Sequence, residues 1–163
     1  MIFVFRVISN EVEDFFRDVE IKSTQTFYQL HNAIQYDADW DSSQLATFYL
    51  TDENWEPAQE ISLIDISGDA LLMDKIKLDK FFGKKSQKLI YTYDVMADRS
   101  LFIELWKVKD EDEDSRQKYP VISNGNGDFP SQVMLQKKQS RQNIFDESDF
   151  DVEESLEEGF EDN

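Results

Sequence analysis

Strand-like and helix-like hydrophobic patterns occupy separate segments of the chain, and this separation limits the folds that it can adopt. One segment has helical spacing, and its buried positions at i, i+3, i+4 and i+7 are Phe27, Leu30, His31 and Ile34. Ser23 or Thr24 can cap this helix at its start. Strand patterns precede and follow it, over residues 2–8, 15–21 and 45–50. One long helix among strands predicts an α+β fold.

The region after this helix continues the same mixture of patterns. A weak strand pattern lies at 60–64, and residues 78–82 predict a short helix that Gly83 stops. Residues 88–95 and 101–108 both alternate like strands, and the short gap between them predicts a hairpin. The element order is therefore β-β-α-β-(β)-α-β-β. We expect a mixed sheet packed on one main helix, in a β-grasp-like arrangement.

Charge divides the chain into a patterned part and a tail. Residues 1–109 carry 12 basic and 19 acidic residues, whereas residues 110–163 carry 5 basic and 16 acidic residues. Ten of these acids lie in 146–163, where no basic residue occurs, and such acidic blocks are usually solvated. We expect an α+β core at 1–109, a loop-rich extension partly packed on it at 110–145, and a disordered acidic tail at 146–163.

Composition argues against several classes of function. The formal net charge of −18 disfavours binding to nucleic acid or to anionic membranes. The absence of cysteine removes disulfides, thiolate catalysis and cysteine-ligated zinc, and the single histidine, His31, rules out a histidine-rich metal site. No apolar run approaches the roughly 20 residues that span a bilayer, and the apolar start at 1–8 is too short for a signal peptide. We therefore expect a cytoplasmic protein that does not associate with membranes.

Two loops imitate ligand sites but do not have the required spacing. Aspartates at alternate positions of 37–41 repeat the first half of a calcium loop, but Ser42 and Phe48 stand where that loop needs a glycine and a bidentate glutamate. The segment 124–127, Asn-Gly-Asn-Gly, lacks the lysine or helix start that follows a phosphate-binding loop, so it predicts a flexible turn. We expect neither a metal nor a cofactor.

Short motifs follow one another along the first part of the chain in a recognisable order. They are an aromatic-arginine strand at 15–21, a Leu-His-x-x-Ile-Gln helix at 30–35, Trp40-Asp41, Tyr91-Thr92-Tyr93-Asp94, Tyr119-Pro120 and the glycine-rich segment 125–130. Over about residues 1–130, this order resembles the plasmid pRiA4b ORF-3-like family, whose members are also labelled insertion-element passenger proteins of the TnpR type. The resemblance implies a shared fold, and the label implies an association with mobile elements.

The chain departs from the family pattern at two places. Gln44-Leu45-Ala46 stands where the family has His-Leu-His, and residues 93–99 stand where it has Tyr-Asp-Phe-Gly-Asp and a tryptophan. The residues that remain for a polar family site are His31, Asp94, Asp98 and Arg99. A histidine on a buried stripe more often packs than catalyses, and the other three can form an ion pair at a turn. We expect no catalytic residue among them.

Lysines concentrate in one stretch, which we call the lysine patch. It consists of Lys75, Lys77, Lys80, Lys84, Lys85 and Lys88. Phe81 and Phe82 lie within it, and a nucleic-acid-binding surface has this composition. A solvated face, or a docking site for the acidic tail, has it too. The negative charge of the whole chain favours these last two interpretations.

Apolar residues recur inside the acidic tail. They are Phe145, Phe150, Val152, Leu156 and Phe160. The last three are four residues apart, so they would lie on one side of a helix. The tail is either a motif that binds a groove of a partner protein, or a mimic of nucleic acid, or a solubilising segment.

These observations predict a non-enzymatic cytoplasmic module that acts through contacts with an unidentified protein. The alternative is an accessory factor of a mobile element or DNA transaction that binds nucleic acid through the lysine patch. An enzyme would need a catalytic constellation, and the residues do not assemble one.

Overall fold

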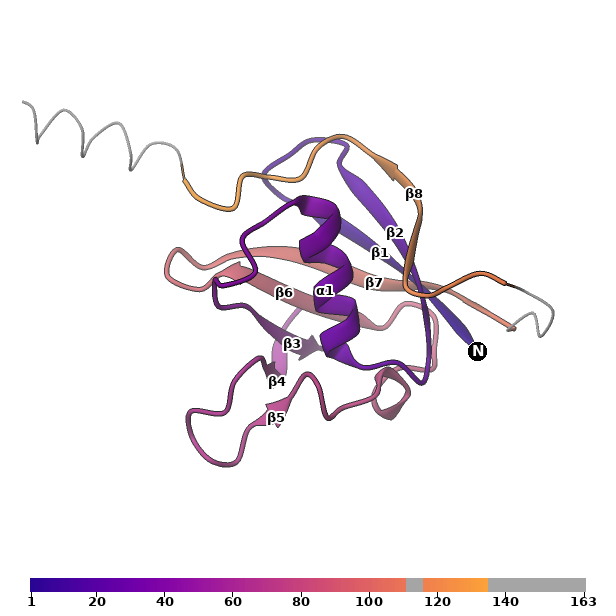
Figure 1. The fold of residues 1–163 in the computed structure, drawn as a ribbon, viewed down its shortest axis with the longest axis horizontal. Coiled ribbons are helices and arrows are strands. Elements are labelled where there is room, and N and C mark those ends of the chain that lie inside the picture. Colours follow the sequence, from indigo (N-terminus) through magenta and orange to yellow (C-terminus); the bar gives the residue numbers. More distant parts are fainter. Residues whose placement is uncertain (111–115, 135–163) are drawn as a thin grey trace, which may run out of the picture. The chain divides into compact units, whose positions relative to one another are not determined.

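The structure is a computed structural model that describes residues 1–110 and 116–134. Residues 1–132 form one compact unit, and residues 133–163 form a second, of which only Val133 and Met134 are described. In the first unit, a mixed sheet of eight strands carries one α-helix within the described residues. Figure 1 shows the helix lying across one face of the sheet. The predicted α+β class is confirmed at this level.

The observed elements match most of the predicted ones and add two strands. In chain order they are β1 (Ile2–Ser9), β2 (Phe16–Lys22), α1 (Phe27–Ala38), β3 (Thr47–Thr51), β4 (Pro57–Ser62), β5 (Leu71–Leu72), the 3-10 helix η1 (Leu78–Lys80), β6 (Lys88–Asp94), β7 (Arg99–Lys109) and β8 (Val121–Asn126). The additions are β5 and β8, and the second predicted helix is only the short η1. The β-grasp-like arrangement and the boundaries at 109 and 145 stay predictions.

The sheet places the first and the last described strands on either side of β2. Its strand order is β5-β4-β3-β6-β7-β1-β2-β8, and only the β4–β5 pair is parallel. The first strand, β1, therefore lies between its neighbour β2 and the distant β7. The last strand, β8, forms one edge of the sheet beside β2.

Helix α1 begins later than the sequence predicted. Its N-cap is Thr26, not Ser23 or Thr24, and Thr26 and Gln29 form a reciprocal capping box. The helix ends at Ala38, and its C-cap Asp39 takes a left-handed backbone conformation and donates its N–H to the carbonyls of Gln35 and Tyr36. Several hydroxyl residues precede the helix, so the sequence did not decide which one caps it.

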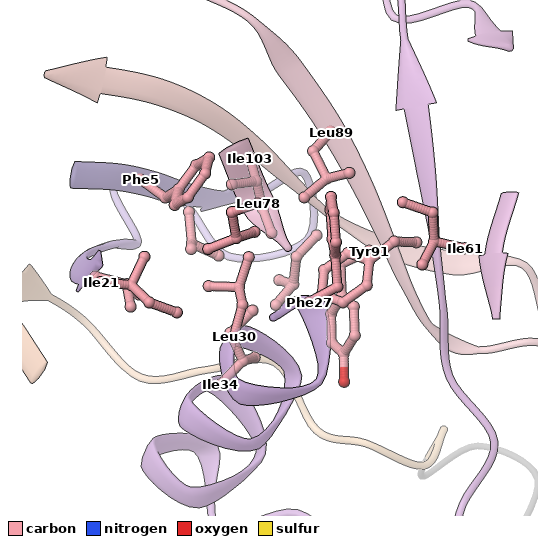
Figure 2. Packing of buried hydrophobic residues seen from close by; sticks show 14 of the residues in the cluster. Phe5, Ile21, Phe27, Leu30, Ile34, Ile61, Leu78, Leu89, Tyr91 and Ile103 are labelled. Carbon is pink, nitrogen blue, oxygen red and sulfur yellow. The ribbon is translucent and has the colours of Figure 1, made fainter. Parts of the chain in front are cut away.

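The core fills the space between α1 and the sheet. Phe27, Leu30 and Ile34 on the helix are buried, as the helical spacing predicts. Figure 2 shows them pointing toward buried side chains of the sheet, such as Phe5 and Tyr91. Full burial of such side chains stabilises the fold by about 1.5–3 kcal/mol each.

The opposite face of the sheet carries stacked aromatic and charged side chains. The Arg6 guanidinium lies 4.1 Å from the Trp106 ring centroid and 4.7 Å from the Phe16 ring centroid. Arg6 also binds Asp18 through two hydrogen bonds of 2.8 and 2.9 Å. Trp106, which is the extra residue where the β1–β7 register shifts, is half-buried there and lies outside the main core cluster. This face therefore combines apolar area with charges that are already paired.

Strand β8 corrects the prediction of a flexible turn at 124–127. Residues Asn124 to Asn126 continue β8 and pair with Asp18, Arg17 and Phe16 of β2. A Cβ at Gly125 would lie 2.7 Å from Cδ of Arg17, so glycine lets that side chain cross the strand. The turn comes only at Gly127, whose φ is +74°.

Candidate functional site

A buried polar cluster joins α1 to β6, and we call it the His31 cluster. His31 and Gln35 lie one helical turn apart and both reach the hydroxyl of Tyr91. The Tyr91 oxygen lies 2.6 Å from Nδ1 of His31 and accepts a hydrogen bond of 2.7 Å from Nε2 of Gln35. A phenol oxygen can donate one hydrogen bond and accept two, so the direction of the His31–Tyr91 bond follows the tautomer of the imidazole.

The His31 cluster is neutral at physiological pH. Burial lowers the pKa of His31 to about 4 and raises the pKa of Tyr91 above its usual value. Among the described residues, no carboxylate bonds to His31, and Oε1 of Gln35 is the one buried side-chain polar atom without a partner. The cluster therefore fixes the helix on the sheet and is poorly suited to proton transfer.

A second, charged cluster surrounds Arg99 at the start of β7, and we call it the Arg99 cluster. Arg99 donates to both carboxylate oxygens of Glu11, with a shortest distance of 2.8 Å, and to Asp94 at 3.4 Å. It also donates to the carbonyls of Ser131 and Gln132 at 2.7 and 3.0 Å. All five N–H groups of the guanidinium are thereby engaged, so Arg99 has none left for a ligand.

The remaining members of the Arg99 cluster are held as firmly. The Tyr93 hydroxyl donates to Glu11 at 2.9 Å, and the Arg99 guanidinium holds the pKa of the Glu11 carboxyl below its usual value. Burial raises the pKa of Tyr93. Asp98 has a left-handed backbone in the β6–β7 turn, and no hydrogen bond joins it to Arg99 in the described chain. Of the predicted polar site, the structure joins Asp94 to Arg99 and places His31 in a different cluster.

Side chains from the resemblance motifs hold the segment 126–132 against the domain. Arg17 donates to the carbonyls of Asn126 and Gly127 at 3.1 and 2.7 Å. Nε1 of Trp40 donates to the Pro130 carbonyl at 3.2 Å. The Gln132 amide exchanges two hydrogen bonds, of 2.8 and 3.0 Å, with the backbone of Asp41. Together with Arg99, these contacts close the fold, which gives the motif residues a structural role.

A groove lies between the helix and the start of the last described strand. The groove has a volume of about 550 Å³ and lies between α1 and β8. Its lining residues are Gln29, Asn32, Ala33, Tyr36, Asp37, Pro120, Val121 and Ile122. No described residue of β2 lines this groove. Strand β8 is an edge strand, and its side away from β2 has no neighbouring strand in the described chain.

The groove is apolar at its centre and acidic at one end. Ala33, Val121 and Ile122 form its centre, and the ring of Tyr36 is 89% exposed at its margin. Asp37 lines the acidic end, and Asp39 caps the helix just beyond it. The last turn of α1 has no basic residue. Helix C-termini carry partial negative charge, so the fold adds to the charge of these aspartates.

The lysine patch is exposed at most of its positions and is not uniformly basic. Its members other than Lys88 are exposed, and no described carboxylate forms an ion pair with any of them. Lys84, Lys85 and Lys88 line a hollow of about 400 Å³ together with Asp52 and Glu53. Lys88 also donates to the Glu53 carbonyl at 2.7 Å. Acidic side chains therefore lie among the lysines.

Other predicted features lie beyond the described ranges or have no counterpart within them. The tail residues Phe145, Phe150, Val152, Leu156 and Phe160 lie outside the described residues. Within residues 1–110 and 116–134, no three His, Asp or Glu side chains gather as metal ligands. The same ranges contain no helix of the length and hydrophobicity needed to cross a membrane.

Sequence reasoning missed the residues that complete both clusters and the groove. Tyr91, Gln35 and Glu11 meet their partners across 60, 56 and 88 positions of the chain, and no local spacing indicates such pairs. Arg17, Trp40, Gln35 and Tyr91 did carry a signal, because all four occur in the resemblance motifs, whereas Glu11 occurs in none of them.

Comparisons with known proteins agree with this architecture. The family described as Plasmid pRiA4b ORF-3-like protein matches residues 2–134. The chain is also similar to the crystal structure of a protein of unknown function from Methanosarcina mazei Go1, with a TM-score of 0.62 and 22% sequence identity. That match covers 76% of this chain and 68% of the other, and at such identity it shows the fold alone. No curated protein matches the chain.

Proposed function

The chain belongs to the plasmid pRiA4b ORF-3-like family, and we propose that it is a non-enzymatic protein-binding module that acts in the cytoplasm. The observation that carries the proposal is the groove between α1 and β8. An apolar groove beside an unpaired strand edge offers both apolar contacts and backbone hydrogen bonds to a partner.

The state of the polar residues supports a binding role over catalysis. His31 is neutral, and all N–H groups of Arg99 are used in bonds within the chain. Neither side chain is therefore available to act on a substrate. A binding module does not need such groups, and its polar clusters can serve entirely to fix the shape of the domain.

Selection from a random displayed-peptide library against the full-length protein tests the proposal. We expect enriched peptides to bind Ala33→Arg about tenfold more weakly, because the longer side chain fills the groove. Ile66→Arg, which adds the same charge at an exposed position outside the groove lining, should bind them unchanged. Enrichment of nothing, or equal binding by both variants, contradicts the proposal.

A second, smaller substitution in the groove keeps the proposal testable if Ala33→Arg does not fold. Tyr36→Ala removes a ring that is 89% exposed, and Met96→Ala removes a side chain that is 94% exposed in the β6–β7 turn. Only Tyr36→Ala should weaken the selected peptides, while thermal unfolding stays unchanged in both.

The second candidate is an accessory factor of a mobile element that binds nucleic acid through the lysine patch. The exposed lysines without described ion-pair partners favour it. The net charge of −18 and the acids in the same hollow oppose it. Titration of duplex and single-stranded DNA at about 150 mM salt decides, because saturable binding that Lys84→Glu with Lys85→Glu abolishes would promote this candidate.

A further inference from the structure

We infer that the groove binds an extended basic peptide, which adds as a further strand to the free edge of β8. The inference rests on the proposed function of the groove and specifies its ligand. It combines the free strand edge, the apolar lining and the charge distribution of the groove walls.

The edge of β8 available to a ligand strand is short. Strand β2 occupies one side of β8, and no described strand occupies the other. Arg17 already engages the carbonyls of Asn126 and Gly127, so the C-terminal end of the strand is covered. Residues 121–124 remain, with Ser123 as the extra residue where the β2–β8 register shifts, and this length suits a peptide strand of about four to six residues.

The lining of the groove sets the side chains of the ligand. In an added strand, alternate side chains point to the same side, so one set would face α1. There they would meet Ala33, Val121, Ile122 and the ring of Tyr36. Aliphatic or β-branched residues at alternate positions fill such a surface best.

The charge of the groove walls indicates the sign of the charge on the ligand. Asp37 lines the groove and uses one carboxylate oxygen for Nε of Arg17 at 2.9 Å. Arg17 is the cation beside it, and its other donors bind backbone carbonyls. Asp39 and the helix C-terminus add negative charge at the same end. A lysine or arginine beside the apolar positions complements this end.

The same charge argues against two other occupants. Residues 146–163 carry ten acids and no basic residue, so Asp37 and Asp39 repel them. A second copy brings a net charge of −18 against a chain of the same charge. We therefore assign the groove to a separate basic segment, and the two excluded occupants become outcomes of the test.

The test uses the full-length protein and synthetic peptides followed by fluorescence anisotropy. The basic probe alternates valine and threonine and carries one lysine at each end. One comparison peptide replaces both lysines by glutamate, and another carries N-methyl groups on alternate backbone nitrogens. We expect both comparison peptides to bind at least about tenfold more weakly, the first through charge and the second through lost backbone hydrogen bonds.

A charge variant of the protein checks the acidic end. Asp37→Asn keeps an oxygen for Nε of Arg17 and removes the negative charge, so it should weaken the basic probe about three- to tenfold with an unchanged unfolding midpoint. Asp74→Asn removes one charge from an exposed position outside the groove lining and should have no effect. Equal binding by both variants would overturn the basic preference.

The outcomes separate this inference from the proposed function. If N-methyl groups do not weaken the probes but Tyr36→Ala does, strand addition is overturned. The groove then still stands as a protein-binding site. Tighter binding by a peptide of residues 146–163, or dimerisation that Tyr36→Ala abolishes, overturns the choice of occupant. If neither the probes nor the library peptides bind in the groove, both proposals fail.

Discussion

The His31 cluster and the Arg99 cluster both hold distant segments of the chain together, one through neutral groups and the other through charged groups. Both join segments that lie far apart in the chain, across 60 positions for His31 and Tyr91 and 88 for Glu11 and Arg99. The first is neutral and lies in the core, whereas the second is charged and lies where chain segments meet at the rim of the sheet. Of these two clusters, the charged one therefore lies where water reaches it, and the one beneath the helix is neutral.

Removal of the Arg99 guanidinium should have the largest effect on the free energy of unfolding. Arg99→Leu leaves Glu11 and the carbonyls of Ser131 and Gln132 without their donors at a site where the Arg99 side chain is 10% exposed. We expect the free energy of unfolding to fall by about 2–4 kcal/mol, measured by urea titration. Arg99→Lys, which keeps the charge without the fork, should lose less. A loss below about 0.5 kcal/mol for Arg99→Leu would show that water replaces the guanidinium.

Protonation of the neutral cluster should have the next largest effect. The pKa of His31 is lowered to about 4 from 6.5, so the unfolded chain binds the proton more readily between these values. Stability contributed by neutral His31 is therefore complete above pH 6.5 and falls as pH drops toward 4. From pH 7.5 to about pH 4.5, the wild type should lose about 2–3 kcal/mol more than His31→Gln, which keeps a neutral hydrogen-bonding side chain at this position. Parallel pH profiles for the two proteins would contradict neutral burial.

The smallest effect should come from the amide that completes the neutral cluster. Gln35→Leu removes the donor to Tyr91, but it also removes Oε1, which has no partner in the described chain. These two changes oppose each other, so we expect the free energy of unfolding to change by less than about 1 kcal/mol. A loss above about 2 kcal/mol would indicate that Oε1 has a bound water as its partner.

Local patterns in the sequence predicted the helix and most of the sheet. The spacing of Phe27, Leu30 and Ile34 predicted the buried stripe of α1. A nearly continuous apolar run predicted β1, and alternation predicted the β6–β7 hairpin. Strand β8 was missed because Ser, Asn and Gly dominate it after Ile122, and only its pairing with β2 makes it extended. Its conformation depends on a strand that lies about a hundred residues earlier.

The candidate site was less predictable than the fold, for a related reason. The contact between Asp94 and Arg99 was expected, since both flank one turn. Glu11, the stronger partner of Arg99, lies in the turn after β1, and nothing in its neighbourhood marks it. The groove arises from α1 and β8 together, so it exists only once both are placed on the sheet. The partner interpretations of the lysine patch and of the tail stay predictions.

The position of β1 in the sheet also has a consequence for synthesis on the ribosome. Its strand partners are β2, which follows at once, and β7, which starts only at Arg99. Until that strand emerges, the β1–β2 hairpin presents one unpaired edge and an apolar face that includes Phe3, Phe5 and Val7. Folding that waits for such distant pairing is slow and exposes the nascent chain to aggregation. A chain released after residue 98 should therefore aggregate, whereas one released after residue 134 should fold.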